Sequence, residues 1–166
     1  MTMILDGTAG ATYPDASVQT KAALSSPQSM IRLSLANGYG STNAVIRRFT
    51  NVHASQGTDI TYADSATLGA SFTINANGVY GISYSDQFSS SSTVGLSLNT
   101  TAPTTVIYSI PIAEILTTCA NATANNSGCA AGTFYLPAGS VVRPHTSGAT
   151  SGGTTALCQF TITRVA

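Results

Sequence analysis

The chain of 166 residues has a formal net charge of zero, and 43% of its residues are hydrophobic while only 7% are charged. Charged residues make up about 25% of an average soluble domain, so this surface is poor in charge. A zero net charge and a single lysine exclude the basic stripe that nucleic-acid binding requires. The apolar content excludes a disordered tail, and the length suits one domain, or one domain with a short arm.

The beginning of the chain shows no targeting segment. Residues 1–10 contain neither a basic region nor a long apolar stretch, so we expect no signal peptide and synthesis in a cytoplasm. The longest apolar run, residues 106–116, is too short to span a bilayer and contains Pro111 and Glu114. We therefore expect no membrane insertion.

Further along the chain, apolar residues recur at every second position, and no window shows the spacing of an amphipathic helix. Such alternation predicts strands with one face in a core and the other toward polar surroundings. Residues 45–52 and 136–142 look like two further strands, and about eight to ten short strands predict an antiparallel sandwich or barrel. The apolar positions of the alternating runs are Ile31, Leu33 and Leu35; Phe72, Ile74 and Ala76; Tyr80, Ile82 and Tyr84; Val94, Leu96 and Leu98; and Cys158, Phe160 and Ile162.

Turn residues separate these runs. Asn77 and Gly78 predict a hairpin that joins residues 70–76 with residues 79–85. Polar stretches without an apolar pattern predict long loops, where binding sites usually lie. The predicted long loops are residues 85–93, 117–132 and 147–155.

Several segments, taken in order, resemble the C1q/TNF-like jelly roll. The sequence MIRLSL is followed by AVIRRFTNV, and SFTINANGVYGISYS is similar to the family's hairpin pattern F-x-I-x-x-x-G-x-Y-x-I-x-y. LPAGSVVRPH is similar to the family's L-x-x-G-d-x-V strand, and the chain closes on the strand QFTITRV, as the family does. The resemblance covers residues 30–166. It implies an all-β, two-sheet sandwich of about ten antiparallel strands, with three copies around a three-fold axis.

The N-terminal stretch resembles something else. Residues 11–23, ATYPDASVQTKAA, are similar to the itFpDGtvQttAa segments of phage tail-fibre and small virion proteins, although Ala16 stands where those segments often carry Gly. We therefore expect residues 1–27 to be a short extended arm that anchors the chain to a particle, outside a jelly roll of residues 28–166. An ordinary flexible N-terminus is the alternative. The candidate anchor residues are Tyr13, Pro14, Asp15 and Gln19.

The resemblance places the strands of residues 79–85 and 157–165 in the sheet nearest the three-fold axis. A chain with so few charges leaves apolar surface exposed, which invites association, and a three-fold ring would bury it. Either the apolar positions of these strands or their outward neighbours face the axis. The candidate trimer-interface or core residues are Tyr80, Gly81, Ser83, Tyr84, Gln159, Phe160, Thr161 and Ile162.

Catalytic constellations are missing from the sequence. His53 and His145 are far apart, six acidic residues are scattered, and no G-x-S-x-G, HExxH, phosphate-loop or calcium-loop motif occurs. We expect no enzyme activity, no cofactor and no bound metal; two carboxylates that meet in space would be the glycosidase alternative. His145 is expected to be an exposed or hydrogen-bonded histidine, with a metal site shared by three-fold mates as the alternative.

Cys119 and Cys129 lie in one predicted loop and form a candidate disulfide. Such a bridge would contribute about 3 kcal/mol in the loop-entropy model, whereas a reducing cytoplasm opposes it. Cys158 shares a face with Phe160 and is expected to be a buried free thiol.

Arg47 and Arg48 are adjacent on a predicted strand, so their side chains point to opposite faces. The arginine that turns away from solvent needs an acceptor. That acceptor would come from another subunit, or the side chain would reach solvent at the strand edge.

We expect a homotrimeric structural protein of a phage particle, a capsid decoration or head-fibre protein on the virion surface. Its partners would be itself and the major capsid or tail proteins. The alternative is a tail-fibre tip that binds a host surface receptor or a glycan, for which the predicted loops offer one aromatic residue, Phe88. A trimeric jelly-roll enzyme is the third, disfavoured hypothesis.

Overall fold

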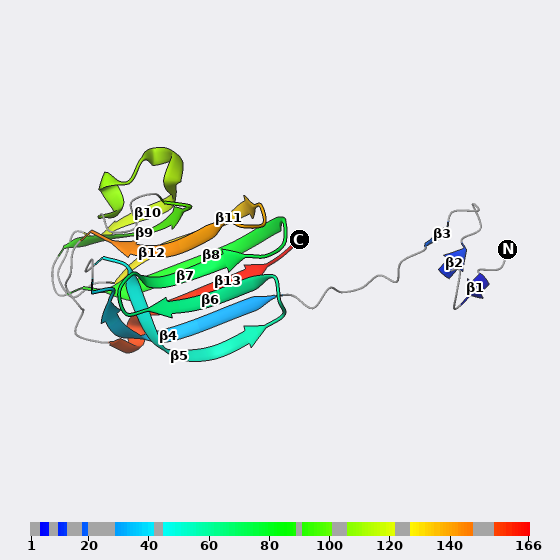
Figure 1. Cartoon of the computed structure of the whole chain (residues 1–166), viewed down its shortest axis with the longest axis horizontal. Coiled ribbons are helices and arrows are strands. Elements are labelled where there is room, and N and C mark those ends of the chain that lie inside the picture. The colour runs from blue at the N-terminus through cyan, green and yellow to red at the C-terminus, as the bar shows by residue number, and fades with distance from the viewer. Residues whose placement is uncertain are drawn as a thin grey trace.

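The computed structural model describes residues 4–6, 10–12, 18–19, 29–41, 45–88, 91–100, 106–121, 127–147 and 155–166. Two five-stranded antiparallel sheets, sheet I and sheet II, pack face to face as a sandwich (Figure 1). Sheet I has the strand order β11-β8-β13-β4-β5, and sheet II has the order β10-β9-β12-β7-β6. The strands are β4 (Met30–Tyr39), β5 (Arg47–Gln56), β6 (Ile60–Ser65), β7 (Gly69–Ile74), β8 (Gly78–Gln87), β9 (Ser92–Leu98), β10 (Ile115–Asn121), β11 (Ser127–Leu136), β12 (Val141–Thr146) and β13 (Gln159–Arg164).

Helix is confined, in the described part of the chain, to three short 3-10 segments: η1 (Ile107–Ser109), η2 (Ile112–Glu114) and η3 (Thr155–Leu157). The expected all-β jelly roll of ten strands is confirmed. None of the described helical segments is long and apolar enough to cross a membrane.

One hydrophobic core lies between the two sheets. Phe160 of sheet I stacks on Phe72 of sheet II, with ring centroids 3.9 Å apart and an interplanar angle of 9°. Tyr80, Tyr84 and Phe160 are fully buried, so the alternation in β8 and β13 does direct the apolar set inward. The expectation that Cys158 is a buried free thiol is also confirmed.

The predicted hairpin around Asn77 and Gly78 is wrong, because β7 belongs to sheet II and β8 to sheet I. β7 pairs with β6 and β12, whereas β8 pairs with β11 and β13. The segment between them passes from one sheet to the other, and Asn77 Oδ1 accepts a hydrogen bond from the backbone N–H of Ala138 at 2.8 Å. Two strands that face one core from opposite sheets alternate in the same way as two strands of a hairpin, so the pattern does not identify the partner.

The predicted loop at residues 117–132 is mostly strand. β10 continues to Asn121 and β11 begins at Ser127, while residues 122–126 lie outside the described part of the chain. The buried positions at the start of β11 are Gly128 and Ala130. Because these residues are small, this stretch lacks the large apolar side chains that mark a strand in a sequence.

Three other boundaries differ from expectation. Residues 136–142 are not one strand, because Leu136 ends β11, Val141 begins β12, and a turn with Gly139 at φ 89° separates them. The predicted loop at residues 85–93 is shorter, since β8 runs to Gln87 and β9 begins at Ser92. The strand predicted at residues 45–52 is β5, which begins at Arg47 and continues to Gln56. Most of the third predicted loop, residues 148–154, lies outside the described residues.

The N-terminal stretch contains a third, small antiparallel sheet of β1 (Ile4–Asp6), β2 (Gly10–Thr12) and β3 (Val18–Gln19). Among the described strands, these three pair only with one another. The stretch expected to be a plain extended arm therefore contains local pairing. Gln19 lies opposite Ala11 in this sheet, whereas Tyr13, Pro14 and Asp15 lie outside the described residues.

Candidate self-association face

The candidate functional surface is the outward face of sheet I. Residues that lie opposite each other in neighbouring strands share a face, so β11, β8 and β13 build rows of cross-strand partners. These outward positions are all exposed or half-buried, and none of them carries a charge. The rows are Thr133, Gly81 and Thr163; Ala131, Ser83 and Thr161; and Cys129, Ser85 and Gln159.

An open hollow of about 400 Å³ lies in the middle of this face, lined among others by Gly81, Ala131, Thr161 and Thr163. Gly81 leaves the space open: a Cβ added there would meet only Val165 Cγ1, at 3.9 Å, which is an ordinary contact. Gly81, on the interior strand β8, therefore helps to keep the hollow open, and an added Cβ would fit without disturbing the subunit.

Apolar side chains stand exposed at one end of the face. Tyr135 on β11 is 67% exposed and lies opposite Val79 on β8. Val165 is 50% exposed, and its backbone N–H donates to the Val79 carbonyl at 2.8 Å. We call Tyr135, Val79 and Val165 the apolar rim of the face. Exposed apolar side chains beside an uncharged, hollowed surface make this face a candidate interaction site.

The structure separates the predicted interface-or-core residues into two sets. Tyr80, Tyr84, Phe160 and Ile162 are fully buried in the core, and their neighbours Gly81, Ser83, Gln159 and Thr161 lie on the outward face. Sequence reasoning missed Tyr135, because it lies on β11, which begins inside a predicted loop. The alternation of Thr133 and Tyr135 with Phe134 and Leu136 was the signal that could have found it.

The outward face of sheet II is different, because the chain covers part of it. Residues 106–114 belong to the connection between β9 and β10, and Ile107 is fully buried against Gly95 of β9. A Cβ at Gly95 would approach Ile107 Cγ1 to 2.5 Å, so glycine is required for this close contact. Ile110 is buried in the same segment, whereas Tyr108 and Ile112 are 68% and 84% exposed. The chain thus supplies its own cover for sheet II.

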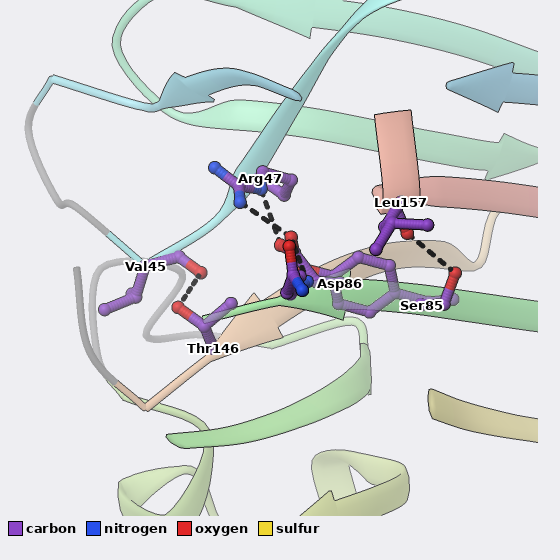
Figure 2. A network of polar contacts seen from close by, with 8 residues as sticks. Val45, Arg47, Ser85, Asp86, Thr146 and Leu157 are labelled. Carbon is purple, nitrogen blue, oxygen red and sulfur yellow. Dashed lines mark hydrogen bonds and ion pairs between the residues drawn. The ribbon is translucent and has the colours of Figure 1, made fainter. Parts of the chain in front are cut away.

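A buried ion pair lies within sheet I, at the end where β5 begins (Figure 2). Arg47 Nε and Nη2 donate to both carboxylate oxygens of Asp86, at 2.6 and 2.7 Å. The Tyr84 hydroxyl donates to Asp86 Oδ2 at 2.9 Å, and the Arg47 guanidinium lies 4.4 Å from the centroid of the Tyr39 ring. β5 and β8 are not neighbours in the sheet, so the pair connects two strands that no ladder joins.

Arg47 keeps its charge despite burial. Burial acts to lower the pKa of Arg47, but the hydrogen bonds to Asp86 and the electrostatic contributions of Tyr84, Asp86 and Tyr39 together outweigh it and raise that pKa above its ordinary value. Burial also raises the pKa values of the Tyr84 hydroxyl and the Cys158 thiol, so both keep their protons. The cluster is therefore an arginine–aspartate pair among neutral donors.

Both expectations for the inward-facing arginine are wrong. Arg47 does not take its acceptor from another subunit, and it does not reach solvent at a strand edge. Its acceptor, Asp86, is 39 residues away along the chain. Such a separation leaves no local pattern to recognise. Arg48 does point to the opposite side, where it pairs with Asp64 at 2.8 Å.

In each described ion pair, the carboxylate contacts an arginine and not another acid. Besides the two pairs above, Arg164 Nη1 lies 3.0 Å from Asp59 Oδ2. Among the described residues, no group of three or more His, Cys, Asp or Glu side chains could hold a metal ion. The ion pairs of Arg47 and Arg48 connect strands, and that of Arg164 connects β13 to the turn before β6.

His145 is a buried, hydrogen-bonded histidine on β12 of sheet II. Its Nε2 lies 2.8 Å from Ser97 Oγ, and both residues are fully buried. Burial inside one subunit contradicts the alternative of a metal site on a three-fold axis, since such a ligand must face the other copies.

The candidate disulfide between Cys119 and Cys129 is absent, and both thiols are free. Cys119 lies opposite the core residue Val94 in sheet II, whereas Cys129 lies opposite Ser85 on the outward side of sheet I. Cross-strand partners share a face, so the two thiols point to different sides of the sandwich. Nearness along the chain did not reveal this difference in direction.

Phe88 is not available for a glycan. Its side chain is fully buried in the core, so the aromatic residue of the predicted loop serves packing.

No family model matches the chain, and no curated protein matches it. Solved structures do match: three of murine APRIL, determined at pH 8.0, 8.5 and 5.0, superpose with TM-scores of 0.60, 0.56 and 0.58. Each match covers 83% of this chain and 99% of the APRIL chain at 14% sequence identity. At this identity the likeness shows the fold alone, which is a TNF-like jelly roll.

Proposed function

We propose that the chain is a homotrimeric structural protein on the surface of a phage particle, with residues 1–27 as the anchor and the jelly roll as the projecting head. The observation that carries the trimer is the outward face of β11, β8 and β13 in sheet I, which is uncharged, hollowed and bordered by exposed Tyr135 and Val165. A three-fold ring would bury this face on every copy and leave none open. The TNF-like fold supports the proposal, because the family resemblance implies the same arrangement.

The absence of charge on this face favours a second copy over a charged partner. A face of Gly, Ser, Thr and Ala can meet itself without like-charge repulsion, whereas a charged partner would lose hydration and find no counter-charge. The residues beside it on β4 include a single charged side chain, Arg32, opposite Thr161.

The experiment for the trimer measures the mass of the full chain by size-exclusion chromatography with light scattering. The wild type should run as three times the 16.9 kDa chain mass. Gly81→Arg and Thr161→Arg should give folded monomers, because each places a charge in the middle of the buried face. Ala63→Arg, at an exposed position of β6 in sheet II, is the matched control and should leave the trimer intact. A monomeric wild type at micromolar concentration would overturn the proposal.

The anchor has a separate test. The independent sheet of β1–β3 and the likeness of residues 11–23 to phage tail-fibre segments support a distinct role for this stretch. A variant without residues 1–27 should remain a folded trimer that no longer joins particles. Normal incorporation of the truncated protein into particles would place the anchor elsewhere.

A second candidate function is a tail-fibre tip that binds a host surface receptor or glycan. The observation that favours it is Tyr108, an aromatic side chain 68% exposed on the segment that covers sheet II. Tyr108→Ala should then abolish adsorption of particles to host cells while leaving their assembly unchanged. Unchanged adsorption would exclude this residue from a receptor site.

A further inference from the structure

We propose that Tyr135 of one copy inserts into the hollow above Gly81 of the next copy, so that each chain contributes one side chain and one hollow to a closed three-membered ring. This inference rests on the proposed self-association and specifies its contact.

The hollow suits an aromatic side chain that has a polar group at its end. Its volume is about 400 Å³, and its lining includes the hydroxyl-bearing residues Ser83, Thr161 and Thr163. Ala131 and the bare backbone of Gly81 provide apolar contact. A phenol combines these two requirements, since its ring is apolar and its hydroxyl donates and accepts hydrogen bonds.

Tyr135 is the aromatic side chain that this face presents. It is 67% exposed and is not among the residues that line the hollow of its own subunit. Its strand, β11, is the edge strand of sheet I, while Gly81 and Thr161 lie on the interior strands β8 and β13. The side chain at the edge of one copy can therefore reach the middle of the face of another copy, as a heterologous contact requires.

A disulfide between positions 135 and 161 can report only a contact between copies, because these positions are far apart within one chain. Tyr135 and Thr161 are separated by one intervening strand and by four residues along β8, from Val79 to Ser83. The spacing of strands and residues puts their Cα atoms about 16 Å apart. A disulfide needs Cα atoms closer than about 7 Å, so cysteines at these two positions can bridge only between copies.

The test is a double variant of the full chain, Tyr135→Cys with Thr161→Cys, in which the exposed Cys129 is replaced by Ser. Mild oxidation should produce a covalent trimer on a non-reducing gel. Mixing the two single-cysteine variants should give covalent dimers, because one Tyr135→Cys chain and one Thr161→Cys chain can form only a single bridge with each other. Tyr108→Cys with Thr161→Cys is the matched control, since Tyr108 is equally exposed but lies off this face, and it should give no bridge.

A second measurement does not depend on cysteine chemistry. Tyr135→Ala should raise the concentration at which half of the trimer dissociates by at least about tenfold, the effect of an interface aromatic residue. Gly81→Leu should fill the hollow and act in the same direction, whereas Tyr108→Ala should leave the dissociation unchanged.

The outcomes distinguish this inference from the proposed function. A wild-type trimer without the bridge, and without any effect of Tyr135→Ala, would overturn the contact but leave the trimer standing. A bridge that stops at the covalent dimer in the double variant would overturn the three-membered ring. A monomeric wild type would overturn both.

Discussion

The two sheets of the jelly roll share one core, yet their outward faces are treated differently. Sheet II is partly covered by residues 106–114, which bury Ile107 against Gly95. Among the described residues, none covers β8, β11 and β13 of sheet I in this way, and a hollow remains above Gly81. Each face has a glycine on an interior strand: Gly95 lets the chain's own side chain approach, and Gly81 leaves the space open.

This difference shows how a chain with few charges can limit the uncharged surface that it exposes. Only 7% of its residues are charged, which is too few to cover two sheet faces with ions. The chain covers part of one face with its own connecting segment, and we propose that a second copy covers the other face. The following variants test the two faces and the core between them, starting from the largest expected effect.

Neighbouring positions on β13 should respond in opposite ways to the same substitution. Phe160→Arg should unfold the subunit, because it removes the ring stacked on Phe72 and buries a charge, a combined loss of more than about 4 kcal/mol. Thr161→Arg, on the outward face, should leave the strand signal of the circular dichroism spectrum unchanged. A folded Phe160→Arg protein would show that this side of β13 does not face the core.

The ion pair inside sheet I should matter far more than its exposed counterpart. Asp86→Asn leaves Arg47 buried without a counter-charge and should lower the free energy of unfolding by about 3–5 kcal/mol. Asp64→Asn, whose arginine partner is partly exposed, should cost about 0–1 kcal/mol. Urea denaturation of both variants measures the difference, and equal losses would contradict the burial of the Arg47–Asp86 pair.

The buried residues of the segment that covers sheet II should contribute to subunit stability, whereas the exposed residues of that segment should not. Ile107→Ala removes a fully buried side chain and should lower the free energy of unfolding by about 2–5 kcal/mol. Ile112→Ala changes a side chain that is 84% exposed and should leave stability unchanged. Thermal denaturation gives both values. If Ile107→Ala is silent, residues 106–114 do not cover the sheet.

Alkaline pH should also destabilise the fold, and one tyrosine from each sheet contributes to this effect. Burial raises the pKa of Tyr39 in β4 and of Tyr62 in β6 from 10.0 to about 12. Between these values the unfolded chain loses protons that the folded chain keeps, so stability is fully present below pH 10 and falls as pH rises toward 12.

Urea midpoints measured across this pH range should therefore decline, and either Tyr39→Phe or Tyr62→Phe should flatten the decline. Tyr108→Phe, at an exposed position, should leave it as steep as in the wild type. A wild-type midpoint that stays constant up to pH 12 would show that neither hydroxyl is shielded.

Sequence reasoning predicted the directions of side chains better than the pairing of strands. The alternation around Tyr80 and Phe160 placed these side chains in the core, as the structure does. The same alternation suggested a hairpin at Asn77 and Gly78 that does not exist, since β7 and β8 belong to different sheets. Period-two patterns carry the direction of a side chain but not the identity of the neighbouring strand.

Of the candidate face, the part on β8 and β13 was predictable and the part on β11 was not. Alternation put Gly81 and Thr161 on the face opposite Tyr80 and Phe160, and the resemblance to the C1q/TNF-like jelly roll placed their strands nearest a three-fold axis. Tyr135 was missed because β11 begins with small residues, whose burial depends on what packs against them rather than on their own hydrophobicity.

The sequence by itself determined the all-β class, the ten-strand jelly roll, the inward set of β8 and β13, and the buried free thiol of Cys158. The all-β class, the inward set and the buried thiol depend on local periodicity, whereas the ten-strand jelly roll was implied by the order of segments that resemble the C1q/TNF-like family. Only the tertiary structure decided that Arg47 meets Asp86, that Cys119 and Cys129 point to different sides, and that the described residues cover part of sheet II but not the outward face of β8, β11 and β13. The physical reason is that local sequence does not encode how distant or returning segments pack: Arg47 and Asp86 are remote in sequence, the two cysteines lie in different sheets, and the cover depends on how residues 106–114 fold back onto sheet II.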